Sequence, residues 1–190
     1  MTTLILGICW FLGVHSISIL APRGRDRAAA RLGEGLWKGL YAVNSIAALV
    51  LLLRGYAEAR LQPIYVYAPP ASMHSVTALL MLPVFPLLLA AYLPGRIKRA
   101  TRHPLLAATV LCALAHVLSN GALHAVLLFG AFLAWAVVDL LSLRRRTPRP
   151  VPGAPPSVAN DWLALGLGLG LYVVTLVWAH ALVIGVPALG

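Results

Sequence analysis

The segment ALHAVLLFGAFLAWAVVDLLSL, residues 122–143, decides the fold class. It contains 22 residues, and His124 and Asp139 are its only ionisable side chains. An α-helix needs about 20 apolar residues to cross the hydrocarbon core of a bilayer. We therefore predict that this segment forms a transmembrane helix.

Five further apolar runs lie on the two sides of this segment. They cover residues 3–20, 36–53, 73–93, 104–119 and 161–186. Pro83 and Pro86 stand inside one of these runs and predict a kink there, because proline removes a hydrogen bond within a helix. The six runs predict an all-α integral membrane protein, a bundle of about six transmembrane helices that forms one domain over residues 1–190.

The composition agrees with a membrane location. Hydrophobic residues make up 61% of the 190-residue chain, and only 11% of the residues are charged. Soluble domains are nearer half apolar and a quarter charged. These proportions exclude a soluble globular domain and a disordered chain. The two cysteines, Cys9 and Cys112, provide no disulfide framework.

Positive charges alternate between the segments that connect the six runs. Counting Lys38 with the first, the first, third and fifth connections hold 13 of the 15 Lys and Arg residues. Because these residues collect on the cytoplasmic side, we predict a multi-pass protein of the cell inner membrane with both termini outside. No basic residue precedes the first run, so we expect an uncleaved helix rather than a signal peptide. The net charge of +10 then reflects topology, and the expected partner is the lipid bilayer, not nucleic acid.

Six histidines are unusual in so apolar a chain, since ionisable residues inside a membrane span are costly and point to function. They are His15, His74, His103, His116, His124 and His180. His15 and His116 each stand 12 residues inside their runs, from opposite sides of the membrane, which places both about 18 Å deep. Two histidines at matched depth on different helices could ligate one haem. The alternative is that each ring hydrogen-bonds a backbone carbonyl of the bundle.

The other histidines lie nearer the surfaces. His74, His124 and His180 fall in the outer third, and their roles stay open. His103 lies at the inner boundary, in the sequence Arg102-His103-Pro104. This motif is either a basic loop that meets a proline-started helix, or a contact for an anion or cofactor at the inner membrane surface, where the helix N-terminus adds positive charge. The chain has no C-x-x-C-H sequence, so covalent haem attachment is excluded.

Two further patterns predict packing and not chemistry. Small residues spaced four apart favour close contacts between membrane helices, and they occur in two of the apolar runs. They are Gly35 and Gly39 in one run, and Gly166, Gly168 and Gly170 in the other. Asp139 precedes the arginines at 144–146 by one to two helical turns, and we predict that it pairs locally with them.

The polar residues together resemble the NnrU family of bacterial membrane proteins and its plant branch, zeta-carotene isomerase. The resemblance covers about residues 3–185, and its most specific part lies between the Arg-His-Pro and Ala-His sequences. The residues that carry it are His15-Ser16, Pro22, Arg102-His103-Pro104, Ala115-His116-Val117-Leu118 and Asn120-Gly121. The chain departs from the family pattern at Ala122, where other members often have an acidic residue, and after His74, where an asparagine would be expected.

The resemblance implies a multispanning helical protein that binds haem b without a covalent bond. Bacterial members are named for an association with nitric oxide and nitrite metabolism, and the plant branch isomerises a cis double bond of a carotene. The family's ligand positions correspond to His15 and His116, so we expect these two as axial ligands. We expect Arg102 and His103 to contact a propionate or other carboxylate of the cofactor.

Three alternatives remain beside a haem protein of nitric oxide or redox physiology. The first is a haem-dependent cis–trans isomerase, which would take an apolar polyene or lipid substrate. The second is a membrane methyltransferase, because Arg102-His103-Pro104 also resembles a motif of those enzymes; here Leu105-Leu106 follows it and no acidic residue follows Asp161. The third is a structural membrane subunit. The sequence does not decide whether the protein is an enzyme.

Overall fold

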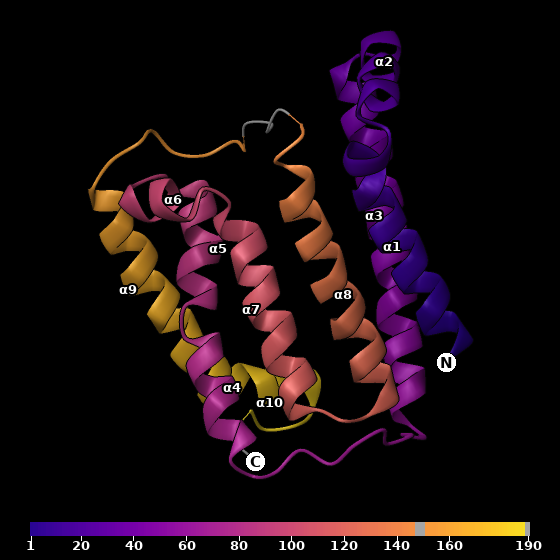
Figure 1. The fold of residues 1–190 in the computed structure, drawn as a ribbon, viewed down its shortest axis with the longest axis vertical. Helices are drawn as coiled ribbons and strands as arrows, with labels where there is room; N and C mark the ends of the chain where they lie inside the picture. The colour runs from indigo at the N-terminus through magenta and orange to yellow at the C-terminus, as the bar shows by residue number, and fades with distance from the viewer. Residues whose placement is uncertain (147–150, 189–190) are drawn as a thin grey trace.

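The computed structural model describes residues 1–146 and 151–188 and contains helices but no strand within them (Figure 1). The elements are α1 (Thr2–Leu20), α2 (Pro22–Leu32), α3 (Glu34–Arg60), α4 (Met73–Met81), α5 (Val84–Tyr92), α6 (Arg96–Thr101), α7 (Pro104–Ser119), α8 (Leu123–Ser142), α9 (Ala159–Val174), the π-helix η1 (Thr175–Ala179) and α10 (His180–Ile184). One isolated β-bridge pairs Tyr65 with Ala122. The predicted all-helical architecture is therefore confirmed.

Five stretches of helix in the described part of the chain are long and apolar enough to cross a membrane. They are α1, α3, α4 with α5, α8, and the final helix from α9 to α10. The sixth apolar helix, α7, has 16 residues and extends about 24 Å, less than the ~30 Å of a typical hydrocarbon core. Five spans are thus supported by length and composition, where the sequence predicted about six.

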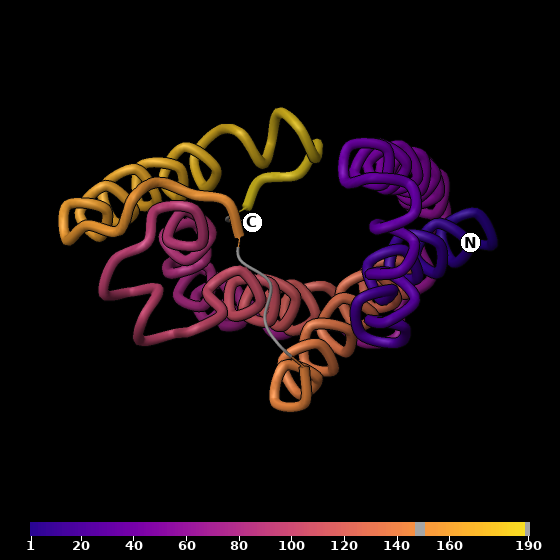
Figure 2. Tube along the Cα trace, turned by 90° about the horizontal axis from the view of Figure 1, so that it is seen from above, coloured from indigo at the N-terminus to yellow at the C-terminus, as the bar shows by residue number. Residues whose placement is uncertain are grey.

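The helices form a curved wall and not a closed bundle. Seen from above, the tube follows a crescent, with α3 near one tip, the final helix near the other, and α7 and α8 in the middle (Figure 2). Figure 1 shows α2, α6 and the end of α8, which Arg144, Arg145 and Arg146 follow, at the same end of the molecule. These are the segments rich in Lys and Arg, so the alternation of charge along the sequence corresponds to one basic end.

The expected kink in the third apolar run is confirmed. The run divides into α4 and α5, and the break falls at Leu82 and Pro83. The connection after α1 differs from the prediction, because residues 22–32 are helical and not a loop. Pro22 begins α2 at a position where its missing N–H is not needed, and Gly33 ends it with a φ of 79°, which suits glycine.

Helices α1 and α3 cross at two glycines that the sequence analysis did not select. A Cβ added to Gly7 would lie 2.5 Å from the Leu52 Cα, and one added to Gly55 would lie 2.5 Å from the Leu4 Cα. Each glycine therefore accommodates the backbone of the other helix. The predicted contacts at Gly35 and Gly39 are wrong, because no atom of the described residues lies within 4 Å of a Cβ built there.

The glycines of α9 also differ in whether they contact another helix. Gly168 packs on α5, where an added Cβ would lie 2.5 Å from the Pro86 backbone nitrogen. Gly166 and Gly170 face open space among the described residues. Only the central glycine of the three therefore makes the predicted close contact.

The predicted local partner of Asp139 is confirmed. Arg146 donates a hydrogen bond from its guanidinium to the Asp139 carboxylate. The Ser142 hydroxyl joins the pair, since it donates to the same carboxylate oxygen at 3.1 Å and accepts from the Arg146 Nε at 2.9 Å. Asp139, Ser142 and Arg146 thus form a small polar network at the end of α8, at the basic end of the molecule.

Asp161 makes a second polar contact at this same end of the molecule, in the other arm of the crescent. It is buried, and its carboxylate accepts hydrogen bonds from the backbone N–H groups of Arg96 and Ile97 at 2.8 and 3.0 Å. The first N–H groups of a helix have no partner within the helix. An aspartate from α9 therefore caps α6, a helix 65 residues away in the sequence.

Replacing Asp161 with alanine is expected to lower the free energy of unfolding by about 1–2 kcal/mol, because two N–H groups of α6 lose their acceptor. Asp161→Asn keeps one acceptor oxygen and should lose less. The measurement is thermal or denaturant unfolding of the purified protein in detergent. Glu34→Ala is the control, because the exposed pair of Glu34 with Lys38 should contribute under about 0.5 kcal/mol. Equal losses in the two alanine variants would contradict the capping role.

Candidate functional site

A cavity of about 410 Å³ lies among the ends of several helices, at the end opposite the basic segments. Its walls come from α3, α4, α7, α8 and the final helix, and they are mostly apolar. Four of the six histidines line it, namely His74, His116, His124 and His180. A volume of this order is typical of sites for small molecules and cofactors.

His116 is held with one ring nitrogen available. Its Nδ1–H donates to the Cys112 carbonyl oxygen at 2.8 Å, one turn earlier on α7. The ring stacks on Phe129 of α8, with 4.2 Å between the ring centroids. A backbone carbonyl can only accept, so Nδ1 carries the proton and Nε2 has the lone pair in the neutral ring. Histidines that ligate metals are oriented in this way by a hydrogen bond from their other nitrogen.

His124 is the second notable residue of the cavity. It is only 5% exposed, and its ring meets the edge of the Tyr56 ring at 5.0 Å. Its Nδ1 atom is buried and has no hydrogen-bond partner among the described residues. A buried polar atom without a partner is costly and rare in proteins. His124 therefore lines the cavity with part of its ring, while its Nδ1 is closed off and has no partner among the described residues.

Arg60 stands at the edge of the same cavity and connects the two arms of the crescent. Its guanidinium lies 5.9 Å from the centroid of the Tyr56 ring and donates a hydrogen bond to the Ile184 carbonyl oxygen at 2.8 Å. This bond joins the last residue of α3 to the last residue of α10. It places one positive charge beside the otherwise apolar walls, where an anionic group of a ligand could pair with it.

The final helix changes its winding where it lines the cavity. Residues Thr175–Ala179 form one π-helical turn, and Thr175, Leu176 and His180 contribute to the wall. Short π-helical segments inside α-helices occur frequently at functional sites. No residue pattern in the sequence indicated this turn, whereas the grouping of His74, His124 and His180 could have been inferred from their common depth near the outer surface.

His15 lies outside this cavity. Its Nδ1–H donates to the Phe11 carbonyl oxygen at 2.7 Å, and its ring stacks on Phe11 and meets the edges of Tyr41 and Trp135. The environment repeats that of His116, with a carbonyl one turn earlier and a stacked phenylalanine. Nε2 is again the nitrogen left available.

The two predicted ligands are not brought into one cavity. His116 contacts Phe129 of α8 and His15 contacts Trp135, six residues further along the same helix. That offset corresponds to about 9 Å at the rise of an α-helix, larger than the few ångströms expected from residue counting. The role of His15 and His116 as a ligand pair stays a prediction.

Arg102 and His103 lie at the far end of α7 from His116, about 20 Å away along the helix. Neither lines the histidine cavity. Arg102 is exposed and has a φ of 59°, and the His103 N–H donates to the Thr101 carbonyl oxygen at 2.6 Å across it. This three-residue turn is a strained backbone conformation for a residue with a side chain. Their predicted contact with the cofactor is not tested by this placement.

A family model described as NnrU protein matches residues 3–188. No curated protein and no solved structure matches the chain. The matched range includes all the residues of the cavity, with both His116 and His124.

Proposed function

Because the chain belongs to the NnrU family, we propose that it is an integral membrane haem b protein that acts in nitric oxide, nitrite or other redox physiology at the cell inner membrane. One observation carries the proposal more than any other. His116, whose Nε2 is available, lines a mostly apolar cavity together with three further histidines, among them the buried His124. Histidine nitrogen is a common axial ligand of haem iron.

The residues of the cavity suit such a group. Haem is a flat, mostly apolar molecule with two carboxylates, and the cavity combines apolar walls with the single guanidinium of Arg60. His116 would hold the iron, and Arg60 would pair with a carboxylate, since its planar fork matches that geometry. When bound, the haem would supply one-electron redox chemistry and an iron centre for a small ligand.

The second axial position has two candidates. The family resemblance implies His15, and the cavity offers His124. Their alanine variants assign the position, because loss of one axial histidine changes the ligand field of the iron. Until then the pair of His15 with His116 is the prediction from sequence, and the pair of His124 with His116 is the one that shares a cavity.

The experiment is an absorption spectrum of the detergent-purified protein, expressed with ample haem. We expect a Soret band, sharpened bands on reduction, and about one non-covalent haem per chain that acid–acetone extracts. Iron-free protoporphyrin added to the same preparation is the control for unspecific uptake. A preparation that shows no Soret band would contradict the proposal.

A second candidate function is cis–trans isomerisation of an apolar polyene. The observation in its favour is the lining of the cavity, which is apolar apart from its histidines, Arg60, Asn120 and a few hydroxyl groups. Incubation of the reduced, haem-loaded protein with a poly-cis carotene, followed by chromatography of the products, tests it. If the His124→Ala and His116→Ala variants still isomerise the carotene, the activity does not depend on this cavity.

We also propose that six helices cross the membrane and that both termini lie outside. The support is the gathering of the basic segments at one end of the molecule (Figure 1). Reporter fusions after the C-terminus should show a periplasmic location, and fusions between residues 151 and 157 should show a cytoplasmic one. A cytoplasmic C-terminus would contradict this topology.

A further inference from the structure

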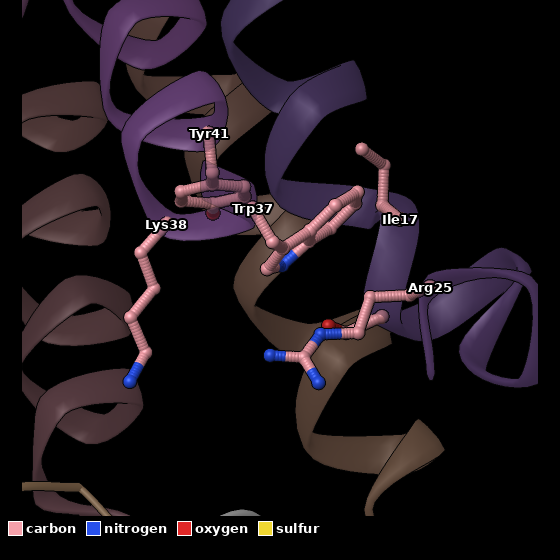
Figure 3. A pocket seen from close by; sticks show the side chains of 6 residues that line it. Ile17, Arg25, Trp37, Lys38 and Tyr41 are labelled. Carbon is pink, nitrogen blue, oxygen red and sulfur yellow. The ribbon is translucent and has the colours of Figure 1, made fainter. Parts of the chain in front are cut away.

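A second cavity, of about 260 Å³, lies at the basic end of the molecule, between the end of α1, α2 and the beginning of α3. It is lined by Ile17, Ser18, Arg25, Trp37, Lys38 and Tyr41 (Figure 3). None of these residues lines the histidine cavity. The two cavities therefore present different chemistry, and the proposed haem protein does not use this one.

Two cations define the polar side of the cavity. The Arg25 guanidinium lies 5.7 Å from the centroid of the Trp37 ring, and its side chain is only 24% exposed, so its position is fixed by packing. Lys38 follows Trp37 on α3. Figure 3 shows the charged groups of Arg25 and Lys38 on the same side of the cavity, below the rings of Trp37 and Tyr41. One bound anion placed between them would meet both.

The carboxylates that now pair with these cations are weak competitors. Arg25 contacts Asp26 at 3.1 Å, and Lys38 contacts Glu34 at 2.7 Å. Both carboxylates are well exposed, and exposed ion pairs contribute little, because water and salt screen them. A phosphate group carries its charge on several oxygens and can accept from a guanidinium and an ammonium together.

The apolar side of the cavity continues into a surface suited to lipid. Trp37 and Tyr41 stand one turn apart on α3, and aromatic residues of this kind are typical of the membrane–water interface. Near these aromatic residues, α3 also exposes the apolar side chains of Leu40 and Val43. A ligand for the whole surface thus has an anionic head, an interfacial middle and an apolar tail.

We propose that this cavity binds the phosphate headgroup of an anionic phospholipid, with the acyl chains lying along α3. Arg25 and Lys38 contact the phosphate, and Trp37 and Tyr41 contact the glycerol region. Basic pockets between membrane helices bind anionic headgroups by this combination of charge and interface. A free phosphate ion shares the head chemistry but lacks the part that would contact α3.

The test uses the full-length protein in detergent, with phosphatidylglycerol, phosphatidylcholine and inorganic phosphate as three separate probes. Thermal unfolding and lipid retention in native mass spectrometry are the readouts. We expect phosphatidylglycerol to raise the unfolding temperature, phosphatidylcholine to have a much smaller effect, and phosphate alone none. An equal shift from inorganic phosphate, or equal binding of both lipids, would overturn the proposal.

Charge-matched variants localise the site. Arg25→Gln with Lys38→Gln should weaken phosphatidylglycerol binding about 25-fold, since each cation near a membrane surface contributes about fivefold. Arg23→Gln with Arg31→Gln removes the same charge from exposed positions of α2 and should change binding far less. Lys38→Gln alone alters one exposed side chain, so it keeps the fold and should weaken binding about fivefold. Equal losses in the two double variants would show only a general effect of charge and would overturn the site.

Discussion

His116→Ala is expected to retain less than about a tenth of the haem bound by the wild-type protein, because it removes a ring whose tautomer and orientation the Cys112 carbonyl and the Phe129 ring already fix for ligation. The measurement is the ratio of Soret absorbance to protein in matched preparations. His74→Ala is the control, since His74 lines the same cavity but is not a predicted ligand. It should keep at least most of the haem.

Alanine variants of the neighbouring histidines show, in the same experiment, which residue provides the second axial ligand. Loss of haem or a high-spin spectrum in His15→Ala assigns the second axial position to His15, and the same change in His124→Ala assigns it to His124. We expect His74→Ala and His180→Ala to keep their haem. Circular dichroism and gel filtration of each variant separate loss of the ligand from loss of the fold. Full haem content in a correctly folded His116→Ala protein would contradict the assignment.

The second large effect concerns the crossing of α1 and α3. Gly55→Ala is expected to destabilise the protein by about 1–3 kcal/mol, because the new Cβ would lie 2.5 Å from the Leu4 Cα and the helices must move apart. Gly7→Ala should act in the same direction through Leu52. Close packing of small residues is a main source of affinity between membrane helices, where the hydrophobic effect contributes little.

Gly39→Ala on the same helix is the matched control. No described atom lies within 4 Å of its added Cβ, and alanine has the higher helix propensity by about 1 kcal/mol. The control should therefore be neutral or slightly stabilising, so the two substitutions are expected to differ in sign. Unfolding of both variants in the same detergent measures the difference. A Gly55→Ala protein as stable as Gly39→Ala would show that the helices do not cross at this point.

The helices could be predicted from the sequence because each apolar run carries its own signal. Length and hydropathy are local properties, and so is the break at Pro83. The segment with Arg23, Arg25, Arg27 and Arg31 was expected to be a loop because it is polar, yet it is helical between Pro22 and Gly33. Its polarity indicated that it lies outside the apolar spans, but not whether its backbone is helical.

The contacts between helices were less predictable. Which glycine meets a neighbouring backbone depends on the crossing angle and on the partner's side chains, so Gly35 and Gly39 could not be distinguished from Gly7 and Gly55 by spacing. Residue counting selected His116, which lines the cavity, but it treated every helix as straight and equally tilted. The offset of His15 from His116 along α8 is the result of that assumption.

The crescent shape has a consequence for how molecules would reach the histidine cavity. The cavity is lined from both arms of the crescent, by α3 and by the final helix (Figure 2), and Arg60 and Ile184 join these two helices at one level. If the helices stand in a bilayer, an apolar molecule can arrive from the hydrocarbon without passing through water. Its concentration beside the protein is then set by its partition coefficient between lipid and water. This coefficient increases about fourfold for each methylene group. A poorly soluble compound would be presented at the highest concentration, and selection among ligands would begin in the lipid.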